Sequence, residues 1–217
     1  MILAIVIGLR TGNQTKKHRT MKLILITAAL LATFASNKSF GQKGKISNDE
    51  RTFILDYLKI TEDNLLETLI NTSEEQWNYK PANGGWSVAQ CMEHIVIAEN
   101  AVFQQLKTAM AAEADHSLNT KHEDGWLLAK VSDRGVKVNT PLPPTSETID
   151  RNEMMVALKD SRTAIRNYLE DKSLPLRTHF GKSPYGPADG YQLLIVIAAH
   201  SMRHHAQMLE VLNELAN

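Results

Sequence analysis

The chain has 217 residues, of which 24 are Lys or Arg and 24 are Asp or Glu, so its formal net charge is zero. This balance argues against a nucleic-acid partner, because binding to phosphate backbones requires a concentrated cationic surface. The single cysteine, Cys91, excludes an internal disulfide framework and any CxxC motif for zinc or redox chemistry. The length suits one domain with a full hydrophobic core.

The first 41 residues have the features of a cleavable signal peptide. The basic stretch KKHRTMK (16–22) precedes the apolar run LILITAALLATFA (23–35) and the small-residue segment SNKSFGQ (36–42). The apolar run is shorter than the roughly 20 residues needed to cross a bilayer, so we expect export rather than a retained membrane anchor. We predict cleavage after Gly41, which would release an exported (periplasmic or secreted) domain at 42–217 with no stable membrane span.

Two methionines, Met1 and Met21, are candidate start residues, because Met21 directly precedes the apolar run and is followed by its own lysine. Residues 1–20, which include His18, are therefore either upstream of the true start or an extension of the basic region. The sequence is compatible with both alternatives.

Within residues 42–217, the spacing of apolar residues predicts an all-α fold with four helices and no strand. The first helix follows a capping box formed by Ser47 and Glu50 and continues to about residue 71. The second begins at Ser87, with Gln90 as its capping-box partner and Trp86 as a hydrophobic staple, and continues to about Ala112.

The third helix is predicted from about Ile149 to Asp171 and the fourth from about Tyr191 to Leu215. A Gly- and Pro-rich link, THFGKSPYGPADG (178–190), separates them. The connection at 113–147 is long and polar, so we expect it to be partly ordered, to cross one end of the bundle and to help cover a site. These elements predict a four-helix bundle, either up-and-down or with a crossover connection.

Three histidines interrupt the apolar pattern of the last helix in the stretch AAHSMRHHAQM (198–208). His200 and His204 are four residues apart, so they lie on one helix face and continue its apolar stripe. His205 lies about 100° from His204 and is predicted at the edge of that stripe. Two buried imidazoles without partners would be costly, which favours coordination of their nitrogens.

A metal site needs a third ligand, and His94 is the histidine that lies inside another predicted helix, on its core side. Helical bundles build metal sites from inward-facing side chains on facing helices. We therefore predict a divalent metal bound by His94, His200 and His204, with an open coordination position; Zn, Ni, Cu and Fe all accept imidazole. The motif is not HExxH, because Ser201 follows His200, so it supplies no general base.

The remaining polar candidates have ordinary explanations. Cys91 is interpreted as a small buried hydrophobic residue. Arg203 is interpreted as a helix-surface charge, with binding of an anionic substrate as the less favoured alternative. Gln90 and Gln207 are either hydrogen-bond partners of the ligands or ordinary polar positions. Three histidines in polar loops are predicted to be solvated: His116, His122 and His179.

Two stretches resemble motifs of the DinB-like superfamily. PANGGWSVAQCMEHIVIAE (81–99) is similar to its Trp-Ser segment followed by histidine, and IAAHSMRHHAQMLEVLN (197–213) is similar to its last helix, with a His-x-x-Arg-His-x-x-Gln core. The resemblance covers most of residues 47–215. It implies a four-helix bundle that binds a divalent metal, usually Zn or Ni, through His94, His200 and His204.

The resemblance also implies several activities, because similar proteins include thiol-dependent transferases and metal-dependent hydrolases. Low-molecular-weight thiols are largely cytoplasmic, so the predicted export favours a hydrolase of an unknown small molecule over a thiol transferase. Two alternatives are a non-catalytic metal- or ligand-binding bundle and an envelope interaction protein with a vestigial site. A homodimer is an allowed assembly.

Overall fold

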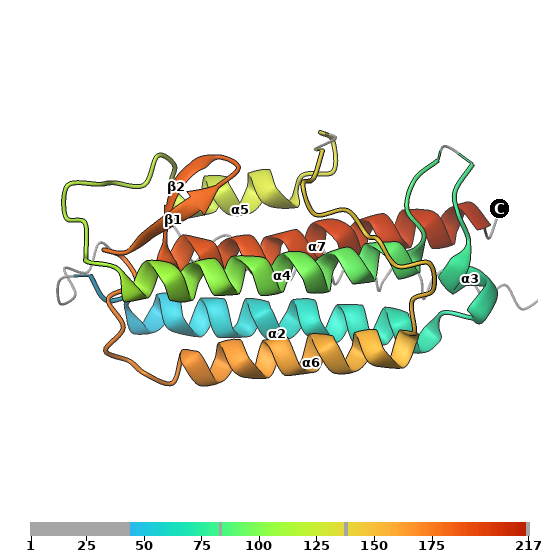
Figure 1. Ribbon diagram of the computed structural model, residues 1–217, viewed down its shortest axis with the longest axis horizontal. Helices are drawn as coiled ribbons and strands as arrows, with labels where there is room; N and C mark the ends of the chain where they lie inside the picture. The colour runs from blue at the N-terminus through green and yellow to red at the C-terminus, as the bar shows by residue number, and fades with distance from the viewer. Residues whose placement is uncertain (1–43, 83, 137–138, 216–217) are drawn as a thin grey trace, which may run out of the picture. The chain divides into compact units, whose positions relative to one another are not determined.

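The structure, a computed structural model, describes residues 44–82, 84–136 and 139–215. Four long helices dominate it (Figure 1): α2 (Asn48–Asn71), α4 (Val88–Ala111), α6 (Arg151–Tyr168) and α7 (Gly190–Leu215). The predicted signal peptide at 1–41 lies outside the described residues and stays a prediction. Within those residues, no helix combines the length and the apolar character needed to cross a bilayer.

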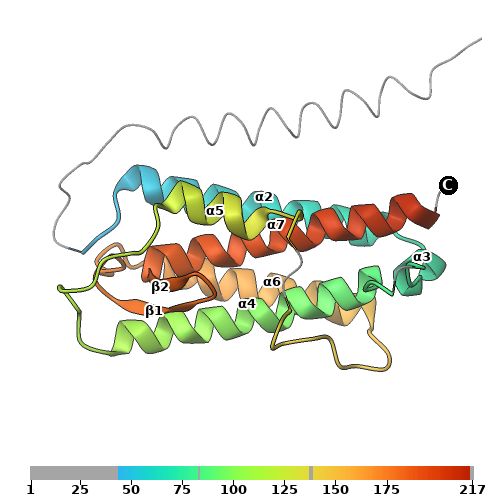
Figure 2. The ribbon, with the colours of Figure 1, turned by 90° about the horizontal axis from the view of Figure 1, so that it is seen from above.

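The four long helices form a bundle in which α7 packs against α4 and α2, while α6 packs against the same two helices. Figure 2 shows α2 and α4 on opposite sides, with α7 between them. The first two long helices of the chain are therefore diagonal rather than adjacent, so the bundle is not a simple up-and-down arrangement. This arrangement brings the last helix directly against α4.

The predicted starts of the first two helices are confirmed by their caps. The Ser47 hydroxyl accepts from Glu50 N at 3.1 Å, and the Glu50 carboxylate accepts from Ser47 N at 2.6 Å. Ser87 and Gln90 form the same reciprocal pair at the start of α4. A third capping box, between Ser73 and Gln76, begins the short helix α3 (Glu74–Asn78), which is not among the four predicted helices.

The third predicted helix, 149–171, is too long at both ends. Asp150 has extended backbone geometry, and its side chain accepts from Glu153 N, so α6 begins only at Arg151. At the other end, the Asp171 carboxylate accepts from Ser173 N at 2.7 Å. This local side-chain turn competes with continuation of the helix, and α6 ends at Tyr168.

The prediction of no strand is wrong, because residues 178–190 contain an antiparallel hairpin of β1 (Phe180–Ser183) and β2 (Gly186–Asp189). Strands of four residues are too short to show a reliable alternation in sequence. Gly186 adopts a φ of 113°, which favours glycine at the turn. A Cβ at Gly181 would lie 2.9 Å from Leu193 Cδ1, so glycine lets β1 approach α7 closely.

The connection at 113–147 is partly ordered, as predicted, because it contains helix α5 (Asp124–Ser132). Leu127, Leu128 and Val131 of α5 are buried, and α5 packs against α7. The bundle therefore carries an additional short helix on α7 (Figure 2).

The core consists of two apolar clusters with polar side chains between them. One cluster includes Ile54, Leu58 and Ile165, and the other includes Leu65, Leu69 and Leu158. Each long helix contributes at least one buried polar residue at the level between the clusters: Glu62 of α2, Glu99 of α4, Arg162 of α6, and Ser201 of α7.

Arg162 is fully buried and connects all four long helices from its position on α6. Its guanidinium lies 2.8 Å from Glu99 Oε2 and donates to the Ser201 hydroxyl at 2.8 Å. It also donates to the Leu58 carbonyl at 3.4 Å. Burial raises the pKa of Glu99, and the charge of Arg162 opposes that shift. The ion pair is therefore buried where the four long helices meet.

Removing one partner of this ion pair should destabilise the protein strongly. Arg162→Met leaves the Glu99 carboxylate buried without its cation, which costs about 3–5 kcal/mol in the free energy of unfolding. The double variant Glu99→Leu/Arg162→Met removes both charges and should recover most of that loss. Urea denaturation measures both values; equal stability of the single and double variants would contradict the assignment.

Candidate metal centre

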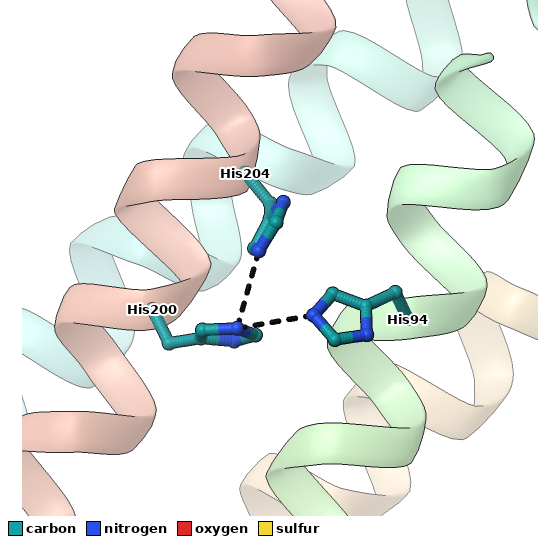
Figure 3. Close-up of side chains that lie close together, drawn as sticks. All are labelled: His94, His200 and His204. Atoms are coloured by element: carbon teal, nitrogen blue, oxygen red, sulfur yellow. Dashed lines mark hydrogen bonds between the residues drawn. The ribbon is translucent and has the colours of Figure 1, made fainter. Parts of the chain in front are cut away.

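Three histidine side chains converge between α4 and α7. His94 projects from α4, while His200 and His204 project from successive turns of α7 (Figure 3). His200 Nε2 lies 3.1 Å from Nε2 of both His94 and His204. One ligand atom from each of the three residues lies within 4.8 Å of the others, so these predicted ligands are brought together by the fold.

Hydrogen bonds on the outer side of two rings fix their tautomers. His94 Nδ1 lies 2.7 Å from the Leu142 carbonyl oxygen, which can only accept, so Nδ1 carries the proton. His204 Nδ1 lies 2.9 Å from Gln207 Oε1, an oxygen that also accepts from Arg134 Nη1 at 3.3 Å. Both Nε2 atoms therefore present lone pairs toward the centre of the cluster.

The inward nitrogens do not satisfy one another. His200 Nε2 can carry at most one proton, yet it faces two acceptor nitrogens at 3.1 Å. An ion with ligand nitrogens at about 2.0–2.1 Å and tetrahedral angles holds those nitrogens roughly 3.3 Å apart. The observed separations from His200 are close to that value, so the donor set fits a single transition-metal ion.

The imidazoles have the protonation state that coordination requires. Burial lowers the pKa of His204 to about 2 and that of His200 to about 3, with neighbouring histidines and the Arg203 charge adding to both shifts. Burial also lowers the pKa of His94. All three rings are therefore neutral near pH 7 and able to donate a nitrogen lone pair.

Trp86 packs against two of the three rings. Its ring centroid lies 4.8 Å from that of His94 and 5.8 Å from that of His204, where the rings stack. Trp86 immediately precedes the cap of α4, so the capping box of this helix positions the indole as well as His94. This packing restricts the orientation of both imidazoles.

Glu93, next to His94 in the sequence, anchors the segment that contacts His94. Its carboxylate accepts from Thr145 N and Ser146 N, both at 3.2 Å, and from the Ser146 hydroxyl. The same segment supplies the Leu142 carbonyl to His94. The prediction that the long connection covers a site is therefore supported where residues 142–146 lie against α4, because the buried Glu93 carboxylate holds this segment in place.

Several other sequence interpretations are confirmed. His116 is exposed, and Cys91 is fully buried, where burial raises the pKa of its thiol to about 12. Gln207 contacts His204, which favours the first of its two interpretations, whereas the Gln90 side chain only caps α4.

His122 keeps intermediate exposure and stacks on Trp126, with ring centroids 3.7 Å apart. Three interpretations are wrong. His179 is buried, and its Nδ1 donates to the Pro175 carbonyl at 3.0 Å. His205 is not at an edge but buried, 2.9 Å from the Thr68 hydroxyl of α2. Arg203 is not a surface charge, because only 8% of it is exposed.

The role of Glu93 leads to a prediction about the connecting segment. Glu93→Ala removes the acceptor for Thr145 and Ser146, so the backbone there should open more often. We expect faster amide hydrogen exchange and faster proteolysis between residues 139 and 149. Glu113→Ala, at an exposed position, is the matched control; equal exchange in both variants would contradict the anchoring role.

Comparisons with known proteins identify the family. A comparison with curated proteins found no match. Among solved structures, YfiT from Bacillus subtilis, described as a probable metal-dependent hydrolase with an unusual four-helix bundle topology, matches with a TM-score of 0.55 and 17% identity. The match covers 82% of this chain and 94% of YfiT, which supports the fold. The DinB superfamily profile matches residues 57–208, so the chain belongs to the DinB superfamily.

Proposed function

We propose that this protein binds one divalent transition-metal ion through Nε2 of His94, His200 and His204, and that it is a metal-dependent hydrolase. The observation that carries the proposal is the convergence of three neutral imidazoles, of which two have outer hydrogen bonds that direct their lone pairs inward. Such outer partners are a regular feature of histidine ligands in metal sites. Zn and Ni are the ions that we favour, since both accept imidazole nitrogen.

The ligand set favours catalysis over a purely structural role. Three protein ligands leave a coordination position open, whereas structural zinc sites are closed by four. When bound, the ion would polarise a substrate carbonyl or activate a water molecule for attack. Among the described residues, the cluster contains no Asp, Glu or Cys, so the chain contributes neutral ligands only.

The surrounding residues hold the ligands rather than exchange protons with a substrate. The Leu142 carbonyl and Gln207 Oε1 each keep a proton on an Nδ1 atom, and the Trp86 ring packs against His94 and His204. The fold shared with YfiT is compatible with hydrolysis, and the reaction itself is our proposal.

We also propose that the protein acts outside the cytoplasm on a small molecule. The basic stretch and apolar run at 16–35 support export. Water is available in every compartment, whereas thiol cofactors are largely cytoplasmic, so export favours hydrolysis over thiol transfer.

Metal content tests the proposed site. The purified protein, incubated with Zn²⁺ or Ni²⁺ and freed of excess ion, should retain about one equivalent by elemental analysis. His94→Ala and His200→Ala should each reduce retention to less than about a tenth, because two imidazoles hold a transition metal poorly. His116→Ala, which changes an exposed loop histidine, is the matched control. Equal retention by all four proteins would sink the proposal.

Processing tests the proposed export. In a secretory bacterial host, mass spectrometry of the exported protein should give a chain that begins at Gln42. A variant lacking residues 23–35 should stay in the cytoplasm, because the apolar run is what the export machinery binds. An intact chain starting at Met1 or Met21 in the cytoplasm would contradict the prediction.

A further inference from the structure

Arg203 lies on α7 next to two of the proposed ligands in sequence. It is three residues after His200 and directly before His204, which places it about 60° from His200 and about 100° from His204 around the helix. Its side chain is buried, with only 8% of the residue exposed. A fixed cation therefore lies beside the three-histidine cluster.

This buried cation has no carboxylate partner within ion-pair distance among the described residues. Its guanidinium donates through Nη2 to the Val136 carbonyl. Five other arginines of the described chain form ion pairs with carboxylates. These are Arg134 with Glu210, Arg151 with Glu74, Arg162 with Glu99, Arg166 with Glu62, and Arg177 with Glu50, Asp124 and Asp189.

Arg51 is the other arginine without a carboxylate contact in the described ranges, and its environment compensates its charge. It donates to the Leu169 carbonyl at the C-terminus of α6, where the helix dipole is negative. Its charge also lowers the pKa of nearby Asp171. Arg203 instead donates to the Val136 carbonyl, which lies in the segment after α5 and not at a helix C-terminus.

No carboxylate of the described residues pairs with Arg203, and a second cation lies on the same side of α7. Arg134 donates to Gln207 Oε1, one helical turn after Arg203, and the same oxygen contacts His204 Nδ1. Two nearby carboxylates contact other residues: Glu210 pairs with Arg134, and Asp133 accepts from Gly135 N and pairs with Lys130. A buried, unpaired charge is costly unless an anion completes the site.

We propose that Arg203 binds an oxyanion of the substrate beside the metal centre, so that the substrate is a small molecule carrying a carboxylate or a phosphate. This inference rests on the proposed function, because it assigns a substrate class to the same site. Three neutral ligands leave the double charge of the ion uncompensated, and Arg203 adds a further positive charge. Guanidinium groups bind carboxylate and phosphate oxygens through paired N–H donors.

A cobalt-loaded protein tests the inference without knowledge of the substrate. The visible spectrum of Co²⁺ bound to the purified protein reports on its ligands and can be titrated with inorganic phosphate, acetate and neutral imidazole at low ionic strength. Arg203→Gln should weaken binding of at least one of the two anions about tenfold or more, by removing a charge-assisted hydrogen bond. Imidazole binding should not change.

Two further variants control for charge and folding. Arg203→Lys should recover part of the anion binding, since it keeps the charge but loses the planar fork. Arg166→Gln, which makes the same change in net charge at a residue paired with Glu62, should bind the anions like the wild type. The anion whose binding falls more in Arg203→Gln identifies the favoured substrate group.

The outcomes separate the two proposals. Failure of the wild type to bind Co²⁺ would overturn the proposed function and this inference with it. Normal Co²⁺ binding with unchanged anion binding in Arg203→Gln would overturn the inference alone. Loss of Co²⁺ binding in Arg203→Gln would also overturn it, because Arg203 would then be a residue that shapes the metal site.

Discussion

The buried ion pair between Arg162 and Glu99 is the constraint on which the bundle depends. A buried charge tolerates few arrangements of its partners, because leaving one partner without the other is costly. Arg162 reaches α2 through the Leu58 carbonyl, α4 through Glu99 and α7 through Ser201. Ser201 directly follows His200, so the residue that Arg162 contacts on α7 is adjacent to the histidine cluster.

The cluster follows from this packing by simple helix geometry. Because α7 lies directly against α4, His94 faces two residues one turn apart on α7, and the three rings meet. Leu142 and Gln207 then orient two of the rings from outside. The proposed metal site thus depends on the contact between α4 and α7 and on the hydrogen bonds outside the two rings. The proposed substrate class depends in addition on the unpaired charge of Arg203.

Helical periodicity was sufficient to predict the bundle and the three converging histidines, since both depend on residues repeating along regular helices. It failed where contacts come from irregular segments. Nothing in the sequence pairs Glu93 with Thr145 and Ser146, 52 and 53 residues later, so its anchoring role was missed. The burial of Arg203 does not follow from the residue pattern of α7, because that pattern does not reveal that the segment after α5 lies against it. The hairpin strands were too short to show a periodicity.

The central claim is that His94, His200 and His204 share one metal ion, and X-ray absorption spectroscopy of the zinc-loaded protein tests it most directly. We predict three imidazole nitrogens at about 2.0–2.1 Å from the zinc ion, with the distant-shell scattering that histidine rings produce, and a further light-atom ligand in the open position. His116→Ala, which changes an exposed loop histidine, should give the same spectrum. A first shell with one imidazole or none would show that the three histidines do not share the ion.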